Sequence, residues 1–138
     1  MLIPWKWMAL EYLIYDVLTL KSDVWSFGVV VWEIFSFGKA PYGHKDFDEV
    51  LEMLESGHRL LCPSEIENIS TDTPRRLYRN LAGKCFIGDP NDRPPFCELV
   101  SMIETEMTEE EQKGYIDNTQ AYHSHYVENY LSLNKNEK

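Results

Sequence analysis

The sequence lacks the features that mark membrane-spanning, secreted and nucleic-acid-binding proteins. Its longest apolar stretch is interrupted by Ser26 and Glu33 before it reaches the roughly 20 residues that a membrane span requires. No signal peptide is recognisable. The chain carries 13 lysines and arginines against 23 aspartates and glutamates, a net charge of −10. This balance argues against a nucleic-acid partner, which would call for a basic surface.

Cysteine and clustered metal ligands are also scarce. The three cysteines, Cys62, Cys85 and Cys97, are odd in number, and no two have C-x-x-C spacing. We therefore expect reduced thiols in a cytoplasmic protein rather than a disulfide or zinc framework. His123 and His125 could share a metal, but two ligands on a flexible tail are too few, so we expect no metal site. The composition, 43% hydrophobic and 26% charged over 138 residues, is that of one globular domain.

Residues 22–35 form the stretch around which the rest of the chain is organised. Their side chains leave no polar face at helical spacing, which predicts a helix in the middle of a domain, covered on every side. The β-branched run Val29-Val30-Val31 raises the alternative of a buried strand. The length of the stretch favours the helix, because strands usually end after about 4–8 residues. Ser22 or Asp23 can cap its N-terminus.

Helices are also predicted before and after this stretch. A short helix is expected over residues 8–13. Asp46 and Glu49 have the spacing of a capping box, and apolar residues at helical intervals followed by Gly57 predict an amphipathic helix over residues 47–54. Thr73 can cap a third helix, with Pro74 at its first position.

The last predicted helix follows Pro94 and Pro95 and carries an apolar stripe that reaches Met107. Residues 101–138, from the last turns of this helix to the end of the sequence, hold eight acidic and three basic residues. After Thr108 the helical pattern gives way to a polar segment, which we expect to be a disordered tail.

The motif S-D-V-W-S-F-G-V at residues 22–29, followed by W-E-I at 32–34, resembles the central helix in the C-terminal lobe of protein tyrosine kinases. The resemblance extends in the same order from about Leu2 to Ile103. It implies a mostly α fold: an incomplete C-terminal kinase lobe over residues 1–107, with the acidic tail at 108–138. Residues 14–22 and 35–42 look most like receptor kinases of the platelet-derived and vascular endothelial growth-factor receptor group.

By the same resemblance, the N-terminus forms the shelf at the end of the activation loop that receives the substrate tyrosine. The shelf residues are Pro4, Trp5, Lys6, Trp7 and Met8. Taken alone, without the resemblance, these residues favour an ordinary buried aromatic N-terminus over a substrate shelf. Two positions depart from the family pattern. Trp5 stands where a β-branched aliphatic residue is usual, and Leu10 replaces the proline of the Ala-Pro-Glu motif, which removes a fixed φ.

The resemblance assigns roles to three more charged residues. Glu11 and Arg93 correspond to a buried structural ion pair, although 82 positions separate them in sequence. Asp23 corresponds to the residue that accepts hydrogen bonds from the backbone of the catalytic loop, so it is either a helix cap or an acceptor whose partner is missing.

The tail tyrosines Tyr115, Tyr122, Tyr126 and Tyr130 lie in settings similar to phosphorylation sites that phosphotyrosine-reading domains bind. The alternative interpretation is that aromatic residues are simply common in this part of the chain.

The sequence has no counterpart of the glycine-rich loop, the strand lysine, the catalytic-loop Asp and Asn, or the Asp-Phe-Gly motif. ATP and Mg²⁺ are therefore cofactors of the parent family and not of these residues. We expect the chain alone to be inactive and, with its central helix partly uncovered, only marginally stable.

Several partners follow from this interpretation. They are the N-terminal part of the kinase domain, protein tyrosine substrates and phosphotyrosine-binding domains at the tail. The expected location is cytoplasmic, and if the receptor resemblance holds, the parent is a single-pass plasma-membrane receptor with this part inside the cell. The alternative function is a non-catalytic interaction module that binds partners through residues 47–54 and the tail.

Overall fold

The computed structural model describes residues 3–108 together with 111, 114, 120, 121, 123 and 124. The chain divides into two units, Met1–Ile103 and Glu104–Lys138. The predicted boundary lies four residues later, after residue 107. Every regular element among the described residues is a helix, which confirms the predicted mostly α class.

The central helix α2 spans Leu20–Phe35 and begins two residues before the predicted stretch. Its N-cap is Thr19, whose Oγ1 accepts a hydrogen bond from the Lys21 N–H at 3.1 Å. Ser22 Oγ accepts one from the Thr19 N–H at 3.1 Å, which completes a capping box. Neither Ser22 nor Asp23 is the N-cap, so that prediction is wrong. Thr19 and Ser22, three residues apart, each supply one half of the capping box.

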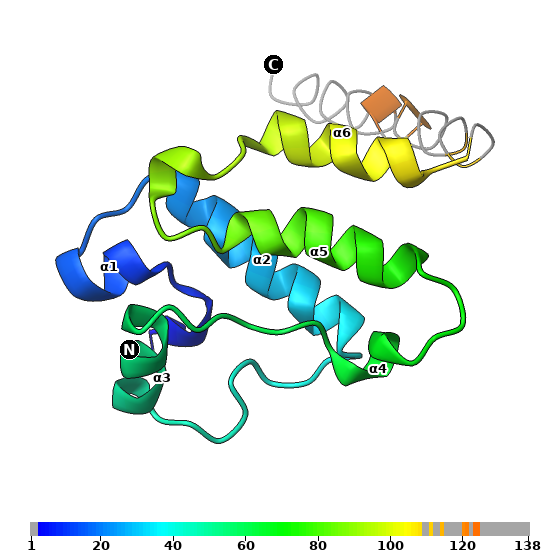
Figure 1. Ribbon diagram of the computed structural model, residues 1–138. Coiled ribbons are helices and arrows are strands. Elements are labelled where there is room, and N and C mark those ends of the chain that lie inside the picture. Colours follow the sequence, from blue (N-terminus) through cyan, green and yellow to red (C-terminus); the bar gives the residue numbers. More distant parts are fainter. Residues whose placement is uncertain (1–2, 109–110, 112–113, 115–119, 122, 125–138) are drawn as a thin grey trace, which may run out of the picture. The chain divides into compact units, whose positions relative to one another are not determined.

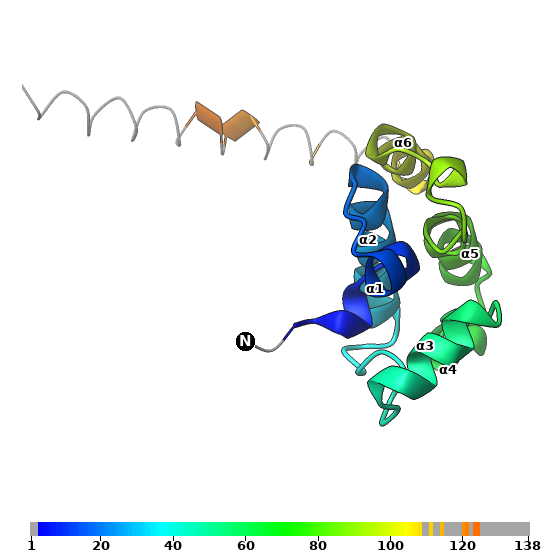
Figure 2. The same cartoon turned by 90° about the vertical axis from the view of Figure 1, so that its left-hand side faces the viewer.

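Helix α5 (Thr73–Cys85) packs along α2, and the views in Figure 1 and Figure 2 both place the two helices side by side. The close approach occurs at Gly28 of α2. A Cβ built there would lie 2.6 Å from Cys85 Cβ and 3.0 Å from the Phe86 ring. The N-cap of α5 is Asp72 rather than Thr73, which moves Pro74 to the second helical position.

The shorter elements surround this helix pair. Their bounds are η1 Trp5–Trp7, α1 Leu10–Tyr15, α3 Phe47–Glu55, α4 Ser64–Glu67, η2 Pro90–Asp92 and α6 Phe96–Glu106. The capping box of α3 is confirmed, since Asp46 and Glu49 exchange hydrogen bonds of 2.9 and 3.0 Å. Helix α1 begins two residues later than predicted, because residues 5–7 form a separate 3₁₀ turn.

One face of α2 is open to solvent among the described residues. Val30 is 41% exposed and Ile34 is 66% exposed, and Phe37 just beyond the helix is 77% exposed. The prediction that α2 is covered on every side is therefore wrong on this face. The separate expectation that some large side chains of the central helix stay uncovered agrees with these exposures.

The second unit contains a pair of hydrogen bonds between Thr108 and Glu111 that the sequence interpretation missed. Glu111 Oε2 accepts a hydrogen bond from the Thr108 N–H at 2.8 Å, and Thr108 Oγ1 accepts one from the Glu111 N–H at 3.3 Å. This is the capping-box pattern. The six described residues beyond Thr108 are all helical, whereas the sequence predicts disorder there. All four candidate tail tyrosines and His125 lie outside the described residues.

The described residues contain neither a membrane-spanning helix nor a cluster of metal ligands. No helix in this part of the chain is both long and apolar enough to cross a membrane. No group of three or more histidine, cysteine, aspartate or glutamate residues there is placed to hold a metal ion.

Candidate functional site

The side chains of Trp5 and Lys6 hold the N-terminal shelf (residues 4–8) against the rest of the first unit. The Trp5 ring meets Phe47 at the start of α3 edge to face, with centroids 5.6 Å apart. Lys6 Nζ donates a hydrogen bond of 2.7 Å to the Gly43 carbonyl and lies 5.4 Å from the Trp5 ring centroid. The shelf is thereby attached to both the loop before α3 and the helix itself.

Trp7 attaches the other end of the shelf to α2. Its Nε1–H donates to Glu33 Oε2 at 2.8 Å, and its carbonyl accepts from Ser26 Oγ at 2.8 Å. Met8 is half-buried beside it, whereas Pro4 is exposed. Ser26 and Glu33, which interrupt the apolar stretch in sequence, are therefore the polar groups that position the shelf.

Glu11 and Arg93 form a bidentate ion pair. Arg93 Nη1 donates to Glu11 Oε1 and Nη2 donates to Oε2, both at 2.8 Å. The side chain of Arg93 is 0% exposed and that of Glu11 is 10% exposed. Planar pairing of this kind is the geometry for which guanidinium and carboxylate are matched. The structure thus brings together two residues that sequence distance alone would leave on the surface.

The remaining donors of Arg93 are also used. Its Nε donates to the Ile87 carbonyl and Nη1 donates to the Lys21 carbonyl, each at 2.8 Å. Ser22 Oγ donates to Glu11 Oε1 at 2.9 Å. Burial pushes the pKa of Glu11 up, but the hydrogen bonds from Arg93, the backbone and Ser22 outweigh it and leave that pKa below 4.5. The ion pair is fully hydrogen-bonded, as a buried charge must be.

Two guanidinium groups lie over the Trp25 ring. Arg93 Cζ is 5.0 Å from its centroid and Arg59 Cζ is 5.2 Å away. Arg59 Nε donates to the Phe86 carbonyl at 2.8 Å, and Phe86 meets Trp25 edge to face. This role of Arg59 was not predicted. Its only sequence signal is a basic residue within an otherwise apolar segment.

Asp23 is exposed in the first turn of α2, and its carboxylate has no hydrogen bond to any residue that the structure describes. Of the two roles predicted for it, the helix cap is excluded because Thr19 is the N-cap. The role of acceptor for the catalytic-loop backbone stays a prediction.

Comparison with known proteins identifies the fold that holds this arrangement. The family model described as protein tyrosine and serine/threonine kinase matches residues 1–103. The chain belongs to this family. Its helical first unit is the C-terminal lobe of a kinase fold.

Similar proteins carry the same family name. The megakaryocyte-associated tyrosine-protein kinase of Rattus norvegicus is 39% identical over 105 residues, which are 76% of this chain and 21% of that protein. The tyrosine-protein kinase transforming protein Abl of Abelson murine leukemia virus is 39% identical over 102 residues, 74% of this chain and 13% of that protein. The vascular endothelial growth factor receptor 3 of Coturnix coturnix is 39% identical over 118 residues, 83% of this chain and 8% of that protein.

Two facts about these kinases bear on the assignment. The chain spans about a fifth or less of the length of each of them. Kinases with and without "receptor" in their names match at the same identity, so the receptor subgroup stays a prediction.

Proposed function

We propose that the first unit is the substrate-binding base of a protein tyrosine kinase domain. The whole domain would transfer the γ-phosphoryl group of ATP to tyrosine in protein substrates. The observation that carries the proposal is the buried Glu11–Arg93 pair, because it joins α1, which directly follows the shelf, to the segment before α6 in a kinase-family lobe.

The shelf has chemistry suited to a tyrosine substrate. Trp5 and Trp7 are half-buried, and each is fixed by a contact to a different helix. A rigid aromatic ledge can pack against a phenol ring. Lys6 adds a cation for acidic residues beside the tyrosine, although its amine also holds the Gly43 carbonyl. The shelf therefore positions a substrate, and positioning is most of what a phosphotransferase lobe contributes.

The chemistry of transfer depends on residues other than these 138. ATP and Mg²⁺ are held in kinases by the glycine-rich loop, a strand lysine and the catalytic-loop and Asp-Phe-Gly motifs, none of which occurs in this sequence. We propose that the N-terminal part of the kinase domain covers the open face of α2 at Val30 and Ile34. The free carboxylate of Asp23 would accept hydrogen bonds from the catalytic-loop backbone.

A chimera tests the proposal. Residues 1–107 replace the matching segment in the kinase domain of the Coturnix coturnix receptor, to which the chain is 39% identical over 118 residues. We expect the purified chimera to phosphorylate tyrosine peptides and not the same peptides with serine in place of tyrosine. A folded chimera that phosphorylates the serine peptides, or that binds ATP without transferring phosphate, would contradict the proposal.

Lys6→Met in the chimera tests the shelf itself. We expect the KM for an acidic tyrosine peptide to rise roughly three- to tenfold, because one exposed charge contact is lost, with little change in kcat. Lys84→Met on α5 is the matched control and should leave KM unchanged. A fall in kcat at constant KM would show that Lys6 does not contribute to binding of the peptide.

The 138-residue chain alone should not transfer phosphate. ATP turnover with Mg²⁺ and a tyrosine peptide is measured for the purified chain. Turnover that survives repeated purification would refute this part of the proposal.

The alternative proposal is a non-catalytic module. Helix α3 offers an exposed charged face, with Asp48 and Glu52 in solvent, and the tail offers Tyr115 and Tyr130 as phosphorylation sites. Paired pull-downs with phosphorylated and unphosphorylated tail peptides test it, since phosphotyrosine readers bind only the former. Either role would place the chain in the cytoplasm. If the receptor resemblance holds, it would be the part of a membrane receptor that lies inside the cell.

A further inference from the structure

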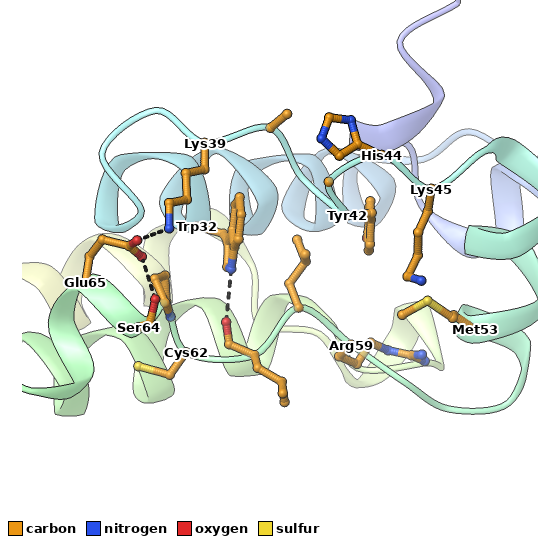
Figure 3. A pocket seen from close by; sticks show the side chains of 15 residues that line it. Trp32, Lys39, Tyr42, His44, Lys45, Met53, Arg59, Cys62, Ser64 and Glu65 are labelled. Carbon is orange, nitrogen blue, oxygen red and sulfur yellow. Dashed lines mark hydrogen bonds and ion pairs between the residues drawn. The ribbon is translucent and has the colours of Figure 1, made fainter.

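A groove of about 660 Å³ lies beside the shelf, between the C-terminal half of α2, the loop before α3 and residues 59–65. Figure 3 shows Lys39 and Glu65 at one end, Lys45 and Met53 at the other, and Trp32 and Tyr42 between them. Lys6 joins the two sites, because its amine binds the carbonyl of Gly43, which lines the groove. None of the shelf residues lines it.

The walls of the groove are fixed by hydrogen bonds. Trp32 Nε1–H donates to the Leu61 carbonyl at 3.0 Å, and the Tyr78 hydroxyl donates to the Leu60 carbonyl at 3.0 Å. Arg59 Nη1 donates to the Leu54 carbonyl at 2.9 Å. Residues 59–65 are therefore held on α2, α3 and α5 before any partner arrives. A preformed site loses less conformational entropy on binding.

The groove has apolar side chains in its lining. Trp32, Met53 and Leu60 are half-buried, and Leu61, which also lines it, is 82% exposed. A single exposed leucine needs no explanation, but one that adjoins an aromatic and aliphatic groove marks a surface able to bury apolar side chains.

The charge of the groove is opposite to that of the chain. Its lining holds Lys39, Lys45 and Arg59 against one acid, Glu65, although the whole chain has a net charge of −10. Lys39 is paired with Glu65, which leaves that end nearly neutral. The side chain of Lys45 has no hydrogen bond or ion pair to any residue in the described part of the chain. The excess positive charge is therefore at the Lys45 end.

Tyr42 adds a hydrogen-bond donor in the middle of the groove. Burial raises the pKa of its hydroxyl to about 12, with Arg59 pulling in the other direction, so it is a neutral phenol at physiological pH. The hydroxyl has no hydrogen-bond partner among the residues that the structure describes. It can therefore donate to an acceptor bound in the groove that it lines.

We propose that this groove binds an extended segment of a partner protein in which a bulky apolar side chain stands next to aspartate or glutamate. The apolar side chain would pack between Trp32 and Leu61, and the carboxylate would bind Lys45 and the Tyr42 hydroxyl. The proposal rests on the chemistry of the groove and is independent of whether the parent domain phosphorylates tyrosine.

Fluorescence anisotropy tests it with the 138-residue chain and a short labelled peptide of leucine, glutamate and serine. We expect saturable binding that weakens as salt rises, since the carboxylate contact is screened. A matched peptide with glutamine in place of glutamate should bind roughly three- to tenfold more weakly. Equal affinity for the two peptides, or no binding of either, would overturn the proposal.

Variants locate the binding. Lys45→Glu and Leu61→Ser should each weaken the glutamate peptide roughly three- to tenfold, and Tyr42→Phe about two- to fivefold. The matched controls are Lys84→Glu and Leu20→Ser, an exposed lysine and an exposed leucine outside the groove. Circular dichroism confirms that every variant is folded. Equal losses in variants and controls would overturn the proposal.

Two other occupants would also overturn it. Concentration-dependent dimerisation abolished by Lys45→Glu would assign the groove to a second copy of the chain. Binding to anionic lipid vesicles with no binding to the peptide would assign it to a membrane surface.

Discussion

The two faces of α2 are built from similar residues and have opposite environments. On the inner face Trp25 and Val29 are fully buried and Gly28 lets α5 approach closely. On the outer face Val30 and Ile34 are 41% and 66% exposed. Hydrophobicity alone therefore does not decide burial, and each face depends on what packs against it. The inner face is specified within the first unit, whereas the outer face has no partner in the described residues.

The inner face is also where the charged groups are most tightly paired. Arg93 stacks on Trp25 and binds Glu11, so the ion pair and the aromatic core form one packed cluster. Removal of one member leaves the others without their partners. The comparison between the faces can therefore be tested by equivalent substitutions on each.

The largest effect is expected for Arg93→Ala. The change leaves the Glu11 carboxylate buried without its partner and removes the cation from the Trp25 ring. Breaking a buried pair in this way costs about 3–5 kcal/mol in the free energy of unfolding, a large part of a domain's stability. Urea denaturation followed by circular dichroism measures it. Arg79→Ala is the control. Arg79 lies on α5, and its ion pair with Asp72, at 3.6 Å, is exposed to solvent. Its loss should therefore change the free energy of unfolding by less than about 0.5 kcal/mol.

The ion pair should also appear in the pH dependence. The pKa of Glu11 is lowered in the folded state, so unfolding takes up a proton as the pH falls. The stabilisation is complete above the unfolded pKa of about 4.5 and is lost as the pH falls through the lower folded pKa. Glu11→Gln should be less stable than the parent chain at neutral pH, with a gap that narrows in acid. A gap independent of pH would contradict the assignment.

A smaller effect is expected for Gly28→Ala. The added Cβ would lie 2.6 Å from Cys85 Cβ, and that atom belongs to the neighbouring helix and cannot rotate away. Overpacking typically costs about 1–3 kcal/mol, which exceeds the helix-propensity gain of up to about 1 kcal/mol.

Gly83→Ala is the matched control for Gly28→Ala. Gly83 is also in a helix and has nothing within 4 Å of the built Cβ, so the change should stabilise the chain by up to about 1 kcal/mol. Thermal unfolding of the two variants should therefore move in opposite directions, and equal shifts would show that α2 and α5 are not in close contact.

The parts predictable from the sequence are those set by local patterns. The capping box of Asp46 and Glu49 defines α3 because both partners lie within one helical turn. The Glu11–Arg93 pair was reached only through the family resemblance, since no local signal joins positions so far apart. The start of α2 was missed because Ser22 and Asp23 are also good capping residues, and only backbone geometry shows that Thr19 has that role.

The groove and the role of Arg59 were not predicted for a related reason. Both depend on where residues 59–65 cross α2 and α5, and that path is set by side-chain hydrogen bonds to backbone carbonyls from Trp32, Tyr78 and Arg59. Hydrogen bonds of this kind have no periodicity along the chain, so a reading of hydrophobic patterns does not detect them.

The smallest effect on stability is expected for Ile34→Ser on the outer face. Because Ile34 is already 66% exposed, its replacement should change the free energy of unfolding of the 138-residue chain by less than about 0.5 kcal/mol. Val29→Ser, at 0% exposure on the same helix, should cost several times as much in the free energy of unfolding.

In the chimera the cost of Ile34→Ser should rise, because the N-terminal part of the kinase domain would cover this surface and make Ile34 a buried residue. Loss of chimera stability with Ile34→Ser, alongside an unaffected isolated chain, would show that the outer face is an interface. If Ile34→Ser is neutral in both proteins, the face stays in solvent and the proposed cover is wrong.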